Sequence, residues 1–84
     1  MEIEHQIKTY IAQNLIFSGD EFKYPEDASF LEEGIVDSLG VMELVSFVED
    51  HFGVKVDDQE ITPDNFDSVN KLSAYVQRKL NSQQ

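Results

Sequence analysis

Apolar side chains recur at helical spacing near both ends of the chain. In the first segment they fall three or four residues apart, which predicts a helix over about residues 2–15 with one apolar face. The same spacing returns between Val69 and Leu80 and predicts a helix over about residues 68–80. Each pattern marks a single face of its helix for burial.

A third helix is predicted over about residues 38–51, and its two faces differ. The apolar face is centred on Leu44, with Val41, Val45 and Val48 beside it. The opposite face carries two apolar residues among polar and acidic ones: Leu39, Met42, Glu43, Ser46, Glu49 and Asp50. We call these six residues the docking face, because exposed apolar side chains ringed by acids are typical of a surface on which a partner docks.

The remaining segments lack a sustained helical period. Residues 16–36 contain turn signals and predict a long loop, which we expect to pack across the helices through apolar anchors. Those anchors are Phe17, Phe22, Phe30, Leu31 and Ile35. Residues 58–66 predict a short or irregular helix, because Pro63 suits a helix start. The whole pattern predicts an all-α fold of three main helices and one short helix.

The start of the central helix carries the residues of greatest chemical interest. Asp37 suits the N-cap position, where its carboxylate accepts hydrogen bonds from free N–H groups of the first turn. Ser38 then takes the first helical position, so its hydroxyl is not needed for capping. A phosphate attached there would face free N–H groups at the positive end of the helix dipole. Both residues also fit an ordinary helix start, which leaves the function open at this point.

The tripeptide Asp37-Ser38-Leu39 lies between the segments ASFLEEG at 28–34 and ELV at 43–45, and Phe52-Gly53 and NFDSV at 65–69 follow it. Together these segments resemble the acyl carrier proteins, from about Ile3 to about Leu80. The resemblance implies a single domain over 1–84, folded as a four-helix bundle of acyl-carrier type with a long first loop. It also implies that Ser38 carries 4'-phosphopantetheine through a phosphodiester, flanked by Asp37 and Leu39.

The resemblance also implies a function and a set of partners. Such a carrier is non-catalytic; it holds acyl groups as thioesters and raises their effective concentration at successive enzymes. The implied pathways are fatty acid, polyketide or specialised lipid biosynthesis. The implied partners are a phosphopantetheinyl transferase, and either an acyl-adenylating ligase or a ketosynthase or acyltransferase, with a basic docking surface.

Gly40 departs from the fatty-acid-synthesis carriers, which usually have an acid after Asp-Ser-Leu. Glycine also weakens the helix start by about 0.5–1 kcal/mol relative to alanine. Asp-Ser-Leu-Gly followed by Val41, together with the segment 66–71, resembles carriers that stand-alone adenylating ligases serve, including D-alanyl carriers. An aminoacyl carrier, of D-alanyl or peptidyl type, is therefore an alternative.

The chain of 84 residues has a formal net charge of −11, concentrated around Ser38. Residues 26–67 hold thirteen acidic residues against one basic residue, Lys55, whereas the two ends together are about neutral. This charge argues against nucleic acid and anionic membranes and favours a basic partner surface. No apolar run approaches the roughly 20 residues of a membrane helix. We therefore expect a cytoplasmic monomer without membrane insertion.

Three other functions agree less well with the sequence. The acidic cluster over 57–64 does not follow the calcium-loop pattern, and His5 and His51 lack metal-ligand spacing, so no metal site is predicted. An enzyme is disfavoured, because the sequence identifies no histidine partner for Ser38 and contains no cysteine. An acidic helical interaction adaptor without a prosthetic group would explain the charge, but it would not require a serine at a helix start.

Overall fold

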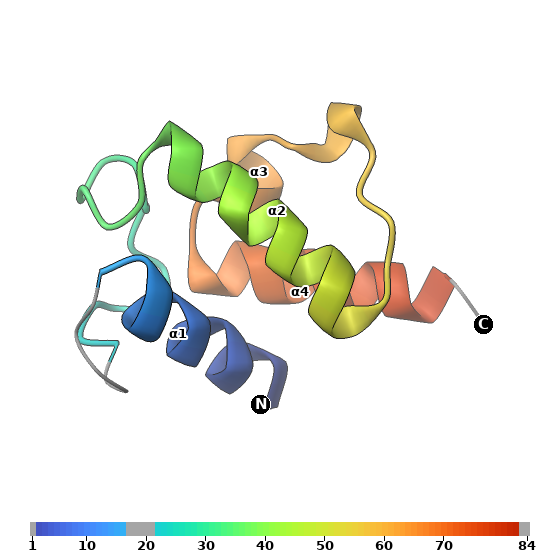
Figure 1. The fold of residues 1–84 in the computed structure, drawn as a ribbon, viewed down its shortest axis with the longest axis horizontal. Helices are drawn as coiled ribbons and strands as arrows, with labels where there is room; N and C mark the ends of the chain where they lie inside the picture. Colours follow the sequence, from blue (N-terminus) through green and yellow to red (C-terminus); the bar gives the residue numbers. More distant parts are fainter. Residues whose placement is uncertain (1, 17–21, 83–84) are drawn as a thin grey trace.

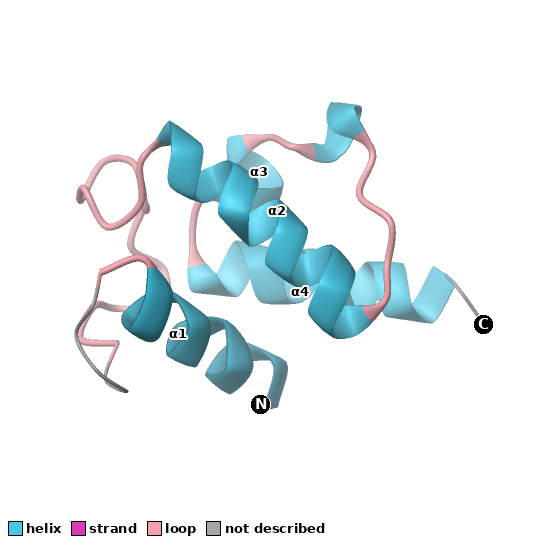
Figure 2. Cartoon of the chain, viewed as in Figure 1, coloured by secondary structure: helices cyan, strands magenta, loops and turns pink. Residues whose placement is uncertain are grey.

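The computed structural model of the protein describes residues 2–16 and 22–82. Its elements are α1 (Glu2–Asn14), α2 (Ser38–Phe52), the 3-10 helix η1 (Asp58–Glu60), α3 (Pro63–Phe66) and α4 (Val69–Ser82). Helices and loops make up the described ranges, which contain no strand (Figure 2). The all-α class with three main helices and a short one is therefore confirmed.

Helix α4 is the element against which the others pack. It contacts α1, α2 and α3, and α2 crosses in front of it in Figure 1. The predicted apolar faces meet in one buried cluster, which includes Ile7, Ile11, Leu44, Val48, Val69, Leu72, Tyr75 and Val76. Burial of these side chains drives the association of the three long helices, since none of them would be stable alone at this length.

The segment 58–66, expected as a short or irregular helix, forms two separate turns. η1 ends at Glu60, and α3 begins at Pro63 with Thr62 at its N-cap. Proline has no N–H group to donate, so it fits the first turn of a new helix better than the middle of a continuous one. At the other boundary, α4 extends to Ser82, two residues beyond the predicted end at 80.

The described part of the long first loop is fastened to the junction between α3 and α4. The Phe30 N–H donates to the Asp67 carbonyl oxygen at 2.9 Å, and the Leu31 N–H donates to Asp67 Oδ1 at 3.0 Å. The Ser29 hydroxyl donates to the other carboxylate oxygen of Asp67. Asp67 therefore satisfies three donors of the loop and holds it across the helices.

The residues predicted to anchor the first loop differ in how deeply they are buried. Phe30 and Ile35 are buried in the core, and Phe22 packs against it half-buried. Leu31, predicted as an anchor, is instead 47% exposed and lines a surface hollow, and the loop is held at this point by the hydrogen bond from its N–H to Asp67 Oδ1. Phe17 lies outside the described residues. In the described ranges, no helix has the length and apolar character needed to cross a membrane.

Candidate functional site

Asp37 and Ser38 lie where the sequence predicts them, at the start of α2. Asp37 is the N-cap, with an extended backbone (φ −95°, ψ −175°), and its Oδ1 accepts a hydrogen bond from the Gly40 N–H at 2.8 Å. Ser38 is the first helical residue and is exposed. Because Asp37 provides the cap, the Ser38 hydroxyl forms no hydrogen bond with any described residue and is free to react.

A second serine follows an aspartate at the start of α4, but it is not available in the same way. Ser68 is 2% exposed, and its hydroxyl oxygen accepts a hydrogen bond from the Lys71 N–H at 3.0 Å. The structure therefore distinguishes two Asp-Ser dipeptides that look alike in the sequence. Of these two serines, Ser38 is the one whose hydroxyl is exposed.

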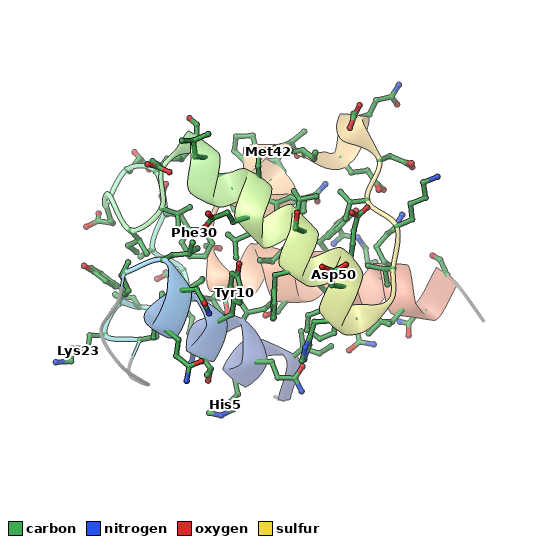
Figure 3. The ribbon with its side chains drawn as sticks, viewed as in Figure 1. His5, Tyr10, Lys23, Phe30, Met42 and Asp50 are labelled. Carbon is green, nitrogen blue, oxygen red and sulfur yellow. The ribbon has the colours of Figure 1, made fainter. Side chains whose placement is uncertain are left out.

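An apolar hollow of about 240 Å³ opens beside Ser38, between α2 and α3. Its lining is apolar apart from Ser38, Thr62 and Asp67, and it includes Leu31, Val41, Met42, Ile61, Pro63 and Phe66. Figure 3 shows Met42 on α2, overlapping the region of α3. Leu31 and Ile61 were not predicted as site residues, because both lie in irregular segments where no periodicity assigns a face.

The predicted docking face is largely at the surface. Leu39 is 77% exposed and Met42 is 52% exposed. Glu43, Ser46 and Asp50 are also exposed. Glu49 differs from the other five residues, because it is half-buried and its carboxylate accepts a hydrogen bond from the Val56 N–H at 3.0 Å. Glu49 thus ties the segment that follows α2 back onto the helix.

The flank of α2 that faces α1 is held by a stack of aromatic rings. The rings of Tyr10 and Phe47 stack with centroids 4.2 Å apart, and Phe47 stacks in turn on His51 at 5.0 Å. Figure 3 shows Tyr10 pointing from α1 toward α2. Burial, together with the nearby Glu43 carboxylate, raises the pKa of the Tyr10 phenol. These contacts hold α2 in place while the docking face remains open.

Among the described residues, no group of three or more histidine, aspartate or glutamate side chains is arranged to hold a metal ion. His51 instead contacts α1, with its Nε2 atom 2.9 Å from Gln6 Oε1. The surface around the start of α2 thus carries the exposed Ser38 hydroxyl, neighbouring acids and the apolar hollow.

The fold and this site together are typical of a carrier, a protein that presents a covalently attached group to other proteins. Residues 5–76 match the family described as "Phosphopantetheine attachment site", so the chain belongs to this family. An acyl carrier protein of Thermotoga maritima is 33% identical over 79 residues, which cover 94% of this chain and 93% of that protein.

Further relatives carry two different names. An acyl carrier protein of Nitratidesulfovibrio vulgaris (strain DP4) is 42% identical over 60 residues, or 71% of this chain and 76% of that protein. A D-alanyl carrier protein of Lactococcus lactis subsp. cremoris (strain MG1363) is 33% identical over 60 residues, with the same coverage of 71% and 76%. The protein is therefore a phosphopantetheine-dependent carrier protein, and its prosthetic group is covalently bound 4'-phosphopantetheine.

The described residues fit this group. A phosphodiester needs an accessible hydroxyl, and Ser38 offers one without losing an existing hydrogen bond. The start of a 15-residue helix also favours the negative charge of the phosphate. When bound, the group supplies a thiol on a long flexible arm, which holds cargo as a thioester.

Proposed function

We propose that Ser38 is the attachment residue and that the protein carries acyl groups for an enzyme of lipid or related biosynthesis. The observation that carries this proposal is the exposed and unbonded Ser38 hydroxyl beside an apolar hollow. Asp37 fixes the first turn by capping it, and Leu39 provides an apolar contact next to the attachment point. The chain itself performs no bond chemistry; it presents the cargo to enzymes.

The lining of the hollow supports an acyl cargo over an aminoacyl cargo. An alkyl chain can leave water among Val41, Ile61 and Phe66, and the burial of each methylene contributes about 0.8 kcal/mol. An aminoacyl group carries an ammonium ion, which is costly to bury among apolar side chains. The aminoacyl alternative is supported by the relative named a D-alanyl carrier protein and by the sequence from Gly40 to Val41.

The docking face supports partners with a basic surface. We propose a phosphopantetheinyl transferase, which attaches the arm, and an acyl-adenylating ligase or a ketosynthase or acyltransferase, which handles the cargo. Exposed acids give fast and salt-sensitive encounter, whereas exposed Leu39 and Met42 provide the apolar contact at the centre of the interface. A monomeric state and a cytoplasmic location stay predictions.

The test is covalent loading, followed by intact mass. The purified parent, Ser38→Ala and Ser68→Ala proteins are incubated with coenzyme A and a broad-specificity phosphopantetheinyl transferase. We expect the parent and Ser68→Ala to gain the mass of one phosphopantetheine and Ser38→Ala to gain none. Ser68→Ala is the matched control, because it removes the other serine that follows an aspartate at a helix start.

Two results would contradict the proposal. Loading of Ser38→Ala would place the arm on another residue. A parent protein that stays unloaded, with a transferase that modifies a known carrier in the same assay, would favour the acidic adaptor. If the parent is loaded as expected, offering its thiol an acyl substrate and an aminoacyl substrate, each with its own adenylating ligase, decides between the two kinds of cargo.

A further inference from the structure

Gly40, in the first turn of α2, approaches the preceding loop unusually closely. It is buried, although Leu39 beside it is 77% exposed. A Cβ atom on Gly40 would lie 2.6 Å from Val36 Cγ1 and 3.6 Å from Val36 Cβ. Carbon atoms in contact are about 3.5–4.0 Å apart. The backbone of α2 therefore lies closer to Val36 than any residue with a side chain would permit.

Val36 has little freedom to move away from this contact. Its side chain is 4% exposed, and its N–H donates to the Phe30 carbonyl oxygen at 3.2 Å. The Ile35 N–H donates to the same oxygen at 2.8 Å. A β-branched side chain in a packed interior also has few alternative rotamers. The loop thus presents Val36 to α2 as a fixed surface.

Gly40 is held on its other side by the helix cap, since its N–H donates to Asp37 Oδ1 at 2.8 Å. Ser38 lies in the sequence between Asp37 and Gly40, in the same helical turn that the cap and the Val36 contact hold. A shift of this turn away from Val36 would carry the Ser38 hydroxyl with it. The core-facing residues further along α2, such as Leu44 and Val48, would keep the rest of the helix in place.

We propose that Gly40 is a positioning residue for Ser38. The missing side chain lets the first turn of α2 close onto Val36, and this contact sets where the Ser38 hydroxyl stands relative to the docking face. The inference rests on the proposed attachment of the arm at Ser38. A transferase bound to Leu39 and Met42 then finds the hydroxyl in line for reaction, and a misplacement of about 1 Å can cost on the order of a hundredfold in rate.

The experiment compares four proteins: the parent, Gly40→Ala, Val36→Ala and the double variant. The melting temperature is measured for each, and kcat and KM are measured separately for arm transfer. In the parent background we expect Gly40→Ala to lower the melting temperature and to lower kcat at least about tenfold, with KM within about threefold. A misplaced hydroxyl slows the reaction after the transferase has bound, so the defect should lower kcat and leave KM nearly unchanged.

In the Val36→Ala background the same replacement should have the opposite effect on stability. The nearest remaining atom of residue 36 is its Cβ, 3.6 Å from the new Cβ, which is an ordinary contact. Alanine favours a helix over glycine, so Gly40→Ala should now raise the melting temperature and change kcat less than about twofold relative to Val36→Ala alone. The sign reversal separates the Val36 contact from general effects of the substitution.

Two outcomes would overturn the inference while leaving the attachment at Ser38 intact. A higher melting temperature for Gly40→Ala in the parent background would mean that the close contact does not constrain the helix. A lower melting temperature with the parent kcat would leave Gly40 a packing role only. A parent protein that accepts no arm would instead overturn the attachment at Ser38, and this inference with it.

Discussion

The two Asp-Ser dipeptides at helix starts have opposite roles in this protein. At α2, Asp37 caps the helix and leaves Ser38 exposed. At α4, Ser68 caps the helix and is buried, whereas Asp67 turns its carboxylate toward the first loop. The same dipeptide thus gives an exposed hydroxyl at one helix and a structural junction at the other.

The residues that follow the two dipeptides also differ. Val69 is fully buried in the core and Ser68 before it is 2% exposed, so the Ser68 hydroxyl needs a partner inside the protein. Leu39, which follows Ser38, is 77% exposed, although Gly40 beside it is buried. Aspartate and serine are equally good caps. Because the dipeptide is the same at both helices, its surroundings in the fold decide which of the two residues caps the helix.

The largest predicted effect is a difference in the stability lost when Asp67 and Asp37 are each replaced by alanine. Asp67→Ala removes both acceptors of the Ser29 hydroxyl and the Leu31 N–H, and should lower the free energy of unfolding by about 2 kcal/mol. Asp37→Ala removes one cap hydrogen bond and should cost about 1 kcal/mol. Urea unfolding, followed by circular dichroism, measures both values.

The matched control for these two variants is Asp64→Ala, because Asp64 is an exposed acid in the first turn of α3. We expect this change to stay within about 0.5 kcal/mol of the parent. A loss for Asp37→Ala that equals or exceeds the loss for Asp67→Ala would contradict the different roles given to the two aspartates.

The sequence is sufficient to predict the parts of this protein that depend on local patterns. Helical periodicity locates the three long helices, and cap preferences identify Asp37 and Ser38. The clasp between Asp67 and the first loop could not be predicted, because its hydrogen bonds join residues 36 and 38 positions apart. Such contacts form only when the tertiary fold brings the segments together.

Gly40 and Glu49 show the same limit within the site. From the sequence, Gly40 indicates only a missing acid and a weaker helix start, whereas the structure shows a close approach to Val36. Helical spacing places Glu49 on the docking face, but it does not reveal the hydrogen bond from Val56. In each case the contacting residue, Val36 or Val56, lies in an irregular segment. Such a segment has no helical period from which the direction of its side chains could be predicted.

A smaller effect tests whether the open start of α2 is the surface that partners use. Glu43→Lys and Met42→Ala should each slow arm loading about threefold to tenfold at low salt. Neither should unfold the protein, because both side chains are exposed. The effect of Glu43→Lys should shrink as salt is added, since the Debye length falls from about 10 Å at 0.1 M to about 3 Å at 1 M.

Asp58→Lys is the control for this docking prediction. It makes the same change in charge at an exposed residue of η1, outside α2. We expect its loading rate to stay closer to the parent rate than that of Glu43→Lys. Parent rates for both docking variants at low salt would count against the docking face, and equal losses in Glu43→Lys and Asp58→Lys would point to net charge alone.

The smallest effect concerns the closed side of the molecule, where η1 is fastened to α4. Hydrogen bonds from the Tyr75 hydroxyl and from Lys79 lower the pKa of Glu60 below its ordinary value of 4.5. Because folding lowers this pKa, the contribution of Glu60 to stability is complete above pH 4.5 and is lost as the pH falls below it.

Glu60→Gln should therefore lower the free energy of unfolding at pH 7 and converge with the parent in acid. The difference at pH 7 should not exceed about 1 kcal/mol, because 33% of the Glu60 side chain is exposed and water screens its charge. Thermal unfolding of both proteins between pH 7 and pH 3 measures this difference. A gap that stays constant or widens in acid would show that the ionised carboxylate does not stabilise the junction between η1 and α4, and that the fastening of this side rests on the apolar contacts of α4 instead.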